Sequence, residues 1–249
     1  MNKDQANKYL SQLRRSLADV STPEKAKAMA RFFNHEVNFI GAKAADIKKV
    51  ITEFQQQNSK VSAYETLELA EQILANAKYT EEVLLAFGLL NKFVKRHFNN
   101  ELLLRFEFWL EHYVSNWSHV DDLCIKTIYQ FMLSRPELIE TTQHWAHSSN
   151  PWCRRASCVV WVKFIKRKIG KSVYILDKSL IFRHCELLLN DPDPFVQKSV
   201  GWLLKVASIE YEQEVIAFIK CNVNNMQRGT IRYAIEKLDS NTRKAILSI

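Results

Sequence analysis

Two seven-residue segments decide the fold of this chain: Asn150-Pro-Trp-Cys-Arg-Arg-Ala and, 43 residues later, Asp193-Pro-Phe-Val-Gln-Lys-Ser. Each runs in the order capping residue, proline, aromatic, any, polar, basic, small. Asn and Asp are preferred helix N-caps and proline suits the first helical position, so each segment predicts a helix start. The offset matches the period of about 40–47 residues of HEAT-type repeats, in which antiparallel helix pairs stack.

Helix starts also occur along the rest of the chain. Further starts are predicted at Thr22-Pro23, Thr80, Asn100, Ser118 and Ser240. They separate roughly a dozen amphipathic stretches of about 10–18 residues, with no room for a sheet. The one longer polar insertion is Arg167 to Lys178, around Gly170. We therefore expect an all-α fold, a curved solenoid of antiparallel HEAT-like helical repeats that forms a single domain over residues 1–249.

The composition excludes several classes of protein. With 47% hydrophobic and 25% charged residues, the 249-residue chain can bury a full core. Its five glycines form neither G-x-G-x-x-G nor G-K-[ST], which argues against a nucleotide cofactor. There is no 18-residue apolar run and no secretory leader pattern, so we expect a cytoplasmic protein without a membrane partner.

The cysteines and histidines favour neither a metal site nor disulfides. The five cysteines lack a C-x-x-C pattern and mostly fall where a helix would bury them: Cys124, Cys153, Cys158, Cys185 and Cys221. His144 and His147 lie three residues apart, but no Cys or carboxylate pattern accompanies them. We expect structural thiols, surface histidines, and no metal or other cofactor.

The charge of the chain is unevenly distributed. The formal net charge is +8, yet residues 1–150 hold 18 Lys+Arg and 18 Asp+Glu, whereas residues 151–249 hold 17 and 9. The whole excess therefore lies in the last 99 residues. A solvated basic face is the plain interpretation, but this concentration favours binding to a polyanion.

Several basic residues in this half have informative positions. Arg154 and Arg155 fall in the first turns of the Asn150-capped helix, where the macrodipole disfavours cations, so an external phosphate is expected to dock there. Lys166 lies eleven residues after Arg155 and would share its side of a continuous helix. Arg228 and Arg232 form an i, i+4 pair at another helix start.

The Pro194 helix combines an apolar stripe with a basic flank. The stripe consists of Val196, Val200, Leu203 and Ala207, and the flank of Lys198, Trp202 and Lys205. Gly201 costs about 1 kcal/mol in a helix interior. Its presence indicates close approach of either a ligand or a neighbouring helix, with Trp202 at the border between core and solvent.

A further motif is Asn116-Trp-Ser-His-Val-Asp121-Asp122. Ser118 and Asp121 have capping-box spacing, which predicts a helix start. Trp117 precedes that cap, but Asp122 occupies the position where a hydrophobic staple partner belongs. Trp117 beside a carboxylate is therefore also a candidate ligand-facing pair.

Taken together, these segments resemble the alkylpurine DNA glycosylases of the HEAT-like-repeat type, the DNA alkylation repair enzymes. The matching motifs run in order from about residue 25 to 240: Phe32-Phe-Asn-His-Glu-Val-Asn-Phe-Ile-Gly41, Asn116-Trp-x-x-x-Asp121, Trp152-x-Arg-Arg-Ala156, Val196-Gln-Lys-Ser-Val-Gly-Trp202 and Arg228-x-x-x-Arg232-Tyr-Ala-Ile-Glu-Lys237. The resemblance implies a solenoid that holds duplex DNA in a basic concave cleft.

The resemblance also implies the site. Trp117, Asp121, Arg155 and Trp202 would be its catalytic residues. DNA contacts would come from Arg154, Lys166, Lys198, Lys205, Arg228 and Arg232. Phe32 stands where relatives often have a DNA-contacting tyrosine, so one hydrogen bond would be missing. Some members of the family bind DNA without detectable cleavage.

The resemblance predicts an enzyme that hydrolyses the N-glycosidic bond of N3- or N7-alkylated purines without flipping the base. The lesion is a cation that leaves as a neutral base, so no general acid is needed. Asp121, kept ionised near a helix N-terminus, would oppose the oxocarbenium-like sugar; Trp117 and Trp202 would pack against it, and Arg155 would hold a phosphate. The alternative is a non-catalytic scaffold that binds branched or damaged DNA or a protein partner. A monomer is expected in either case.

Overall fold

The predicted helix starts define the elements of the computed structural model, which describes residues 1–249. The chain forms two compact units, Met1–Glu101 and Leu102–Ile249, and each is described by itself. The first unit contains α1 (Lys3–Asp19), α2 (Pro23–Ala30), α3 (Ala44–Gln57), α4 (Ala63–Ala75) and α5 (Thr80–Leu90). Thr22 caps α2 as expected, with Pro23 at the first helical position.

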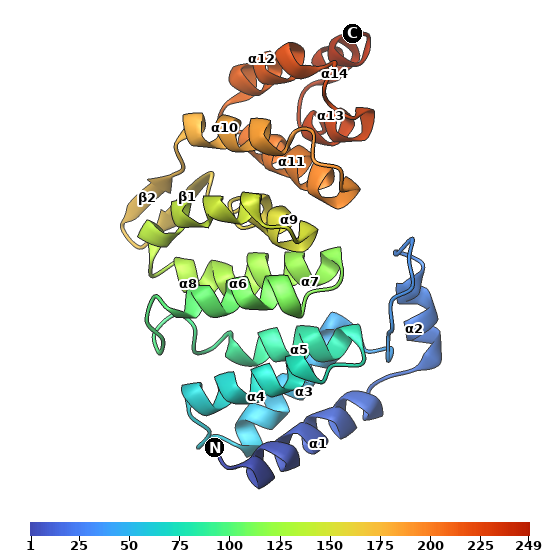
Figure 1. The fold of residues 1–249 in the computed structure, drawn as a ribbon, viewed down its shortest axis with the longest axis vertical. Helices are drawn as coiled ribbons and strands as arrows, with labels where there is room; N and C mark the ends of the chain where they lie inside the picture. Colours follow the sequence, from blue (N-terminus) through green and yellow to red (C-terminus); the bar gives the residue numbers. More distant parts are fainter. The chain divides into compact units, whose positions relative to one another are not determined.

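The core of the first unit lies around α5, which packs against both α3 and α4 (Figure 1). Leu69, Ala70 and Phe87 have no exposed surface. The segment that leads into α3 is held by Glu81, whose buried carboxylate accepts the backbone N–H groups of Ile40, Gly41 and Ala42 at 3.0, 2.8 and 3.1 Å. These bonds account for a fully buried charge in an apolar core.

Phe32, the residue that stands in place of the relatives' tyrosine, lies in the turn after α2, and 76% of its surface is exposed. It contributes little to the core of the unit, so its side chain is available to solvent.

The second unit holds every candidate site residue. Its elements are α6 (Leu102–His112), α7 (Trp117–Asp122), the π-helix η1 (Leu123–Ile128), α8 (Tyr129–Met132), the 3-10 helices η2 (Pro136–Leu138) and η3 (Glu140–His147), α9 (Pro151–Val159), β1 (Lys166–Ile169), β2 (Ser172–Ile175), α10 (Lys178–Leu188), α11 (Pro194–Ala207), α12 (Glu212–Asn222), α13 (Arg228–Ala234) and α14 (Ser240–Leu247). Within this unit α9 packs against α7 and α11, and α11 packs against α13 (Figure 1).

The two segments that predicted the repeat have the same local structure. The Asn150 side chain accepts the N–H of Trp152 at 2.9 Å, and the Asp193 side chain accepts the N–H of Phe195 at 2.8 Å. Pro151 and Pro194 each occupy the first turn. The apolar stripe predicted for α11 is fully buried, as expected: Val196, Val200, Leu203 and Ala207.

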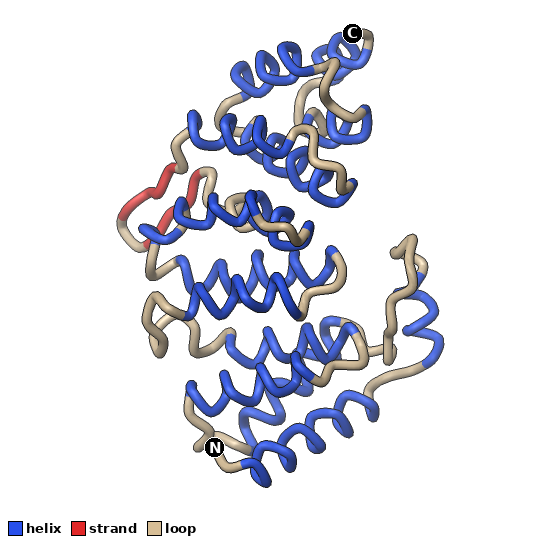
Figure 2. Tube along the Cα trace, viewed as in Figure 1, coloured by secondary structure: helices blue, strands red, loops and turns tan.

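One expectation about secondary structure is wrong. The polar insertion forms an antiparallel hairpin of β1 and β2, drawn in red in Figure 2, in which Lys166 pairs with Ile175 and Lys168 with Val173. Gly170, with φ +61°, and Lys171 form the two-residue loop, which fits a type II′ turn. Tyr174 packs on Phe164 of the helical layer, with ring centroids 6.2 Å apart. Lys166 therefore does not share a helix with Arg155.

The cysteines are mostly buried, as the sequence predicted. Four cysteines are buried free thiols, and Cys221 is exposed. None of the helices combines the length and the apolar character needed to cross a membrane. No group of three or more His, Cys, Asp and Glu side chains is arranged to hold a metal ion.

Candidate functional site

The start of α7 is fixed by a buried asparagine. The Asn116 side-chain oxygen accepts the N–H groups of Ser118 and His119 at 3.0 and 3.2 Å, and its amide lies 3.3 Å from His119 Nε2. Asn116 is therefore the N-cap, and the expected cap at Ser118 is wrong by two residues. Both Asn116 and His119 are buried, at 0% and 2% exposure. This rigid start orients Trp117, the first residue of α7.

Trp117 and Asp121 lie on one side of α7 because they are four residues apart. Trp117 is half-buried, and 17% of the Asp121 side chain is exposed. Directly after Asp122 the helix widens into the π-helix η1, a distortion that often accompanies functional sites. A carboxylate and an indole thus lie together where the backbone departs from regular α geometry.

Arg155 of α9 clamps the Asp121 carboxylate. Its Nε and Nη2 donate to Oδ1 at 3.0 and 2.9 Å, and Nη2 also donates to Oδ2 at 2.9 Å. Nη1 donates to the carbonyl oxygen of Phe195 on α11 at 2.6 Å. One guanidinium therefore connects α7, α9 and α11 and fixes the carboxylate in one orientation.

This geometry corrects the role expected of Arg155. Its side chain is only 4% exposed, and its nitrogens are bonded to Asp121 and Phe195, so it is not placed to grip an external phosphate. We expect an anion beside Arg155 because of its position at a helix N-terminus. The protein itself supplies this anion, as the carboxylate of Asp121. Arg155 acts as a positioning residue for Asp121.

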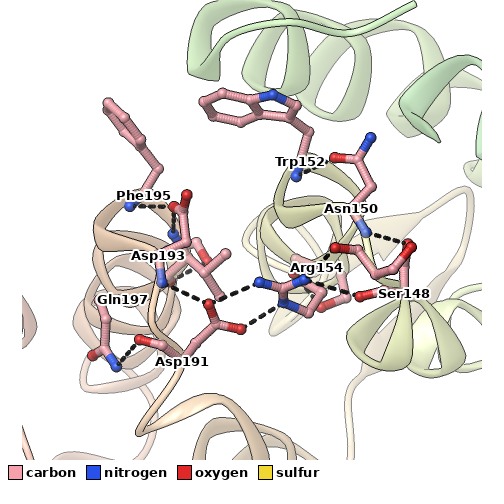
Figure 3. A network of polar contacts seen from close by, with 12 residues as sticks. Ser148, Asn150, Trp152, Arg154, Asp191, Asp193, Phe195 and Gln197 are labelled. Atoms are coloured by element: carbon pink, nitrogen blue, oxygen red, sulfur yellow. Dashed lines mark hydrogen bonds and ion pairs between the residues drawn. The ribbon is translucent and has the colours of Figure 1, made fainter. Parts of the chain in front are cut away.

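Arg154 needs the same correction. Its Nε and Nη2 donate to the two carboxylate oxygens of Asp191 at 2.6 and 3.1 Å, and Nη1 donates to the carbonyl oxygens of Ser148 and Ser149 (Figure 3). Asp191 also accepts the N–H of Asp193 at 2.9 Å. Arg154 therefore joins α9 to the start of α11, and these contacts account for a cation at this helix N-terminus.

The ionisation of Asp121 depends on opposing effects. Burial raises the pKa of its carboxyl group, while the positive charges of Arg155 and then Lys198 lower it. The net shift of this pKa is upward, which opposes the expectation that the helix N-terminus keeps Asp121 ionised.

On α11, Trp202 follows Lys198 by four residues, so the two share a side of the helix. Lys198 is exposed and Trp202 is half-buried. Hydrogen bonds join Asp121, Arg155 and Phe195 directly. Trp202 makes none of these contacts and shares with them only the helix α11, on which it lies on the same side as Lys198. Gly201 faces α13: an added Cβ would lie 3.0 Å from the Thr230 carbonyl oxygen and 3.2 Å from Tyr233 Cβ. The helix-packing explanation for Gly201 is therefore the one the structure supports.

The remaining basic candidates differ in which groups of the protein contact their charged ends. Lys166 pairs with Glu210 at 2.7 Å, and Lys205 lies 3.9 Å from the Tyr233 ring centroid and 3.3 Å from Glu236. Arg228 and Arg232 are exposed on α13, and Arg228 donates to the Leu247 carbonyl. Surface pairs of this kind exchange readily for other anions, because they contribute only about 0–1 kcal/mol.

Sequence reasoning missed two sets of contacts near the candidate site. Asn116 and His119 were available in the same motif, but their mutual contact depends on how the chain turns before α7. Lys163, whose Nζ donates to the Ile125 carbonyl of η1 at 2.9 Å, had no sequence signal beyond its charge.

Comparison with known proteins identifies the family to which the chain belongs. Its fold is that of a helical-repeat protein, as the sequence predicted. The family model of the DNA alkylation repair enzymes matches residues 13–238, and the chain belongs to this family.

Solved structures agree with this assignment. A predicted DNA alkylation repair enzyme from Enterococcus faecalis matches with a TM-score of 0.75 and 18% identity, over 88% of this chain and 97% of that one. AlkD2 from Streptococcus mutans matches with a TM-score of 0.59 and 16% identity, over 94% and 100%. The Pseudomonas fluorescens alkylpurine DNA glycosylase AlkC, bound to DNA with an abasic site analogue, matches with 0.56 and 14%, over 99% and 66%. A search of curated protein sequences gave no match.

Proposed function

We propose that this protein is a DNA glycosylase that excises cationic N3- and N7-alkylated purines from duplex DNA. The observation that carries the proposal is the Asp121 carboxylate, which is fixed by Arg155, partly desolvated and still 17% exposed beside Trp117. Membership of the DNA alkylation repair enzyme family and the DNA-bound alkylpurine glycosylase among its structural neighbours support it.

The chemistry suits so small a site. An N3- or N7-alkylated purine already carries positive charge and departs as a neutral base, so the leaving group needs no proton. Positive charge develops instead on the sugar, and a fixed carboxylate in a partly desolvated cleft stabilises it. Three of the roughly four lone-pair sites of Asp121 accept hydrogen bonds from Arg155, which leaves one to orient the attacking water.

The other residues have supporting roles in this proposal. Trp117, and Trp202 from α11, pack against the deoxyribose and add a cation–π attraction of about 0.5–2 kcal/mol. Lys198 takes over the phosphate contact that Arg155 cannot make, and Lys205, Arg228 and Arg232 extend the grip on the backbone. The base stays in the duplex, so selectivity comes from the charge and lability of the lesion itself.

The test is release of N7-methylguanine from duplex DNA by purified protein, compared with Asp121→Asn and Asp122→Asn. Asp122 is the matched control because it neighbours Asp121 and pairs with Lys126 instead of Arg155. We expect release by the wild type, a loss of at least about 100-fold in Asp121→Asn, and near-normal release by Asp122→Asn.

Absence of release by the wild type, or equal release by both variants, contradicts the proposal. Salt-sensitive DNA binding without release would favour the alternative of a non-catalytic DNA-binding scaffold. Lack of DNA affinity even at low salt would favour a scaffold for a protein partner.

A further inference from the structure

Two further cations, Lys163 and Arg167, lie beside the helical segment that continues from Asp121 through η1 to Tyr129. Lys163 follows α9, and its ammonium group donates to the Ile125 carbonyl at 2.9 Å. Ile125 comes four residues after Asp121 in the continuous run of α7 and η1. One helical turn advances about 5.4 Å, so the Ile125 backbone, whose carbonyl holds the Lys163 ammonium, lies about one turn along the helix axis from the Asp121 backbone.

The β-hairpin adds a guanidinium to this group. The Arg167 Cζ lies 5.2 Å from the centroid of the Tyr129 ring, and the Lys163 Nζ lies 4.4 Å from the same centroid. Arg167 pairs across the hairpin with Tyr174, which packs on Phe164. Because paired residues share a face of the ribbon, the hairpin directs Arg167 toward the helical layer, and Lys166 and Lys168 to the other side.

These two cations differ from several others in the unit because no carboxylate pairs with them. Arg154, Arg155, Lys166, Lys178 and Lys205 each have an Asp or Glu partner within 3.3 Å. Burial lowers the pKa of Lys163, and the charges of Arg167 and Lys126 lower it further. Crowded like charges are unfavourable, and a bound anion relieves the repulsion.

We infer that Lys163 and Arg167 form a binding subsite for a backbone phosphate of the DNA whose lesion nucleotide lies at Asp121. Successive phosphates of one strand are about 3.4 Å apart along the duplex axis, so a sugar at Asp121 carries phosphates within one helical turn of it. Charge favours a phosphodiester over a neutral ligand. The inference rests on the proposed function only in placing DNA at this site.

The experiment measures binding of an undamaged duplex by fluorescence anisotropy across a series of salt concentrations. The variants are Lys163→Gln, Arg167→Gln and the double variant, and the control is Lys220→Gln, which removes one exposed charge from α12. We expect each site variant to reduce the slope of log affinity against log salt by about one, and to weaken binding roughly eightfold at 0.1 M salt.

A double variant that matches Lys220→Gln in slope and affinity overturns the inference, as does a wild-type protein with no affinity for undamaged duplex at low salt. A fall in melting temperature without a change in slope shows that the two cations only support the Tyr129 ring, and also overturns it. If Lys163→Gln fails to fold, Arg167→Gln carries the same expectation.

The excision assay separates this inference from the proposed function. Loss of the phosphate subsite is expected to raise the half-saturating concentration of lesion DNA while the maximal rate changes little, in contrast to Asp121→Asn. If the wild type releases no base but the salt slopes change as expected, the glycosylase proposal fails and the phosphate subsite stands.

Discussion

Arg155 of α9 holds both carboxylate oxygens of Asp121 on α7, at 2.9 Å each from its Nη2. The two residues are 34 positions apart in the sequence, yet they form one unit with the Phe195 carbonyl of α11. A cation is unfavourable at a helix N-terminus, and a carboxylate is unfavourable in a desolvated position. As a pair, the two charges stabilise each other.

Arg155→Gln is expected to destabilise the protein by about 3 kcal/mol, because it leaves a buried carboxylate without its partner. It should also slow base release about 100-fold, since Asp121 loses its fixed orientation. Denaturant unfolding and single-turnover release measure the two effects.

Arg154→Gln is the matched control, because it removes an adjacent arginine that pairs with Asp191 instead. It should lower stability yet leave the release rate of the folded protein near that of the wild type. A similar rate loss in both variants would show that rigidity of α9, and not the Asp121 contact, is what matters.

The pH dependence of base release follows from the environment of Asp121. Burial raises the pKa of this carboxyl group. Only the charged form opposes a positive sugar, so release should be constant above the raised pKa and should fall as the pH decreases through it. The fall should begin at higher pH than for an ordinary aspartate, which titrates near about 3.9. Single-turnover rates across the acidic range check this, and a profile that stays flat down to the ordinary value would contradict it.

The fold was largely predictable from the sequence because its signals are local. Asn150 and Asp193 cap helices that begin within a few residues of them, and the periodic stripe of α11 needs no distant information. The hairpin was missed because Arg167 and Tyr174 pair only once Tyr174 can pack on Phe164 of the helical layer. Val173, Tyr174 and Ile175 are strand formers, but strands of four residues on either side of a two-residue turn are too short for their pattern alone to separate them from a loop.

The site was predictable only in part, for the same physical reason. Trp117 and Asp121 are close in sequence, so their shared helix face followed from spacing. The partners of Arg154 and Arg155 are Asp191 and Asp121, at separations of 37 and 34 residues. Their position at a helix N-terminus indicated an anion for these arginines, but not that the protein supplies it.

The stability of the second unit should decrease in mild acid because of His184. This histidine has no exposed surface, contacts Ser157 Oγ at 3.0 Å, and has no partner for Nδ1. Burial lowers the pKa of His184 to about 4. In the unfolded chain it titrates near about 6.5, so its contribution is complete above that value and is lost as the pH falls toward 4, up to roughly 3 kcal/mol.

Denaturant unfolding at a series of pH values, with His184→Gln beside the wild type, measures this loss. The variant should show a shallower decrease of the unfolding free energy with acid. His144→Gln is the control, because it removes an exposed histidine on η3 and leaves His184 in place, so the decrease attributed to His184 should persist. Equal slopes for the wild type and His184→Gln would contradict the assignment.

Gly201→Ala tests whether that glycine serves helix packing. Alanine improves helix propensity by about 1 kcal/mol, but the new Cβ would lie 3.0 Å from the Thr230 carbonyl oxygen and 3.2 Å from Tyr233 Cβ. A backbone carbonyl cannot move aside as a flexible side chain can, so overpacking should dominate and the variant should lose about 1 kcal/mol or more of unfolding free energy. Gly229→Ala on α13 is the matched control, since its Cβ would meet nothing within 4 Å and it should gain up to about 1 kcal/mol. If both alanines stabilise the protein equally, α13 does not need the close approach at Gly201, and the ligand explanation for that glycine becomes the better one.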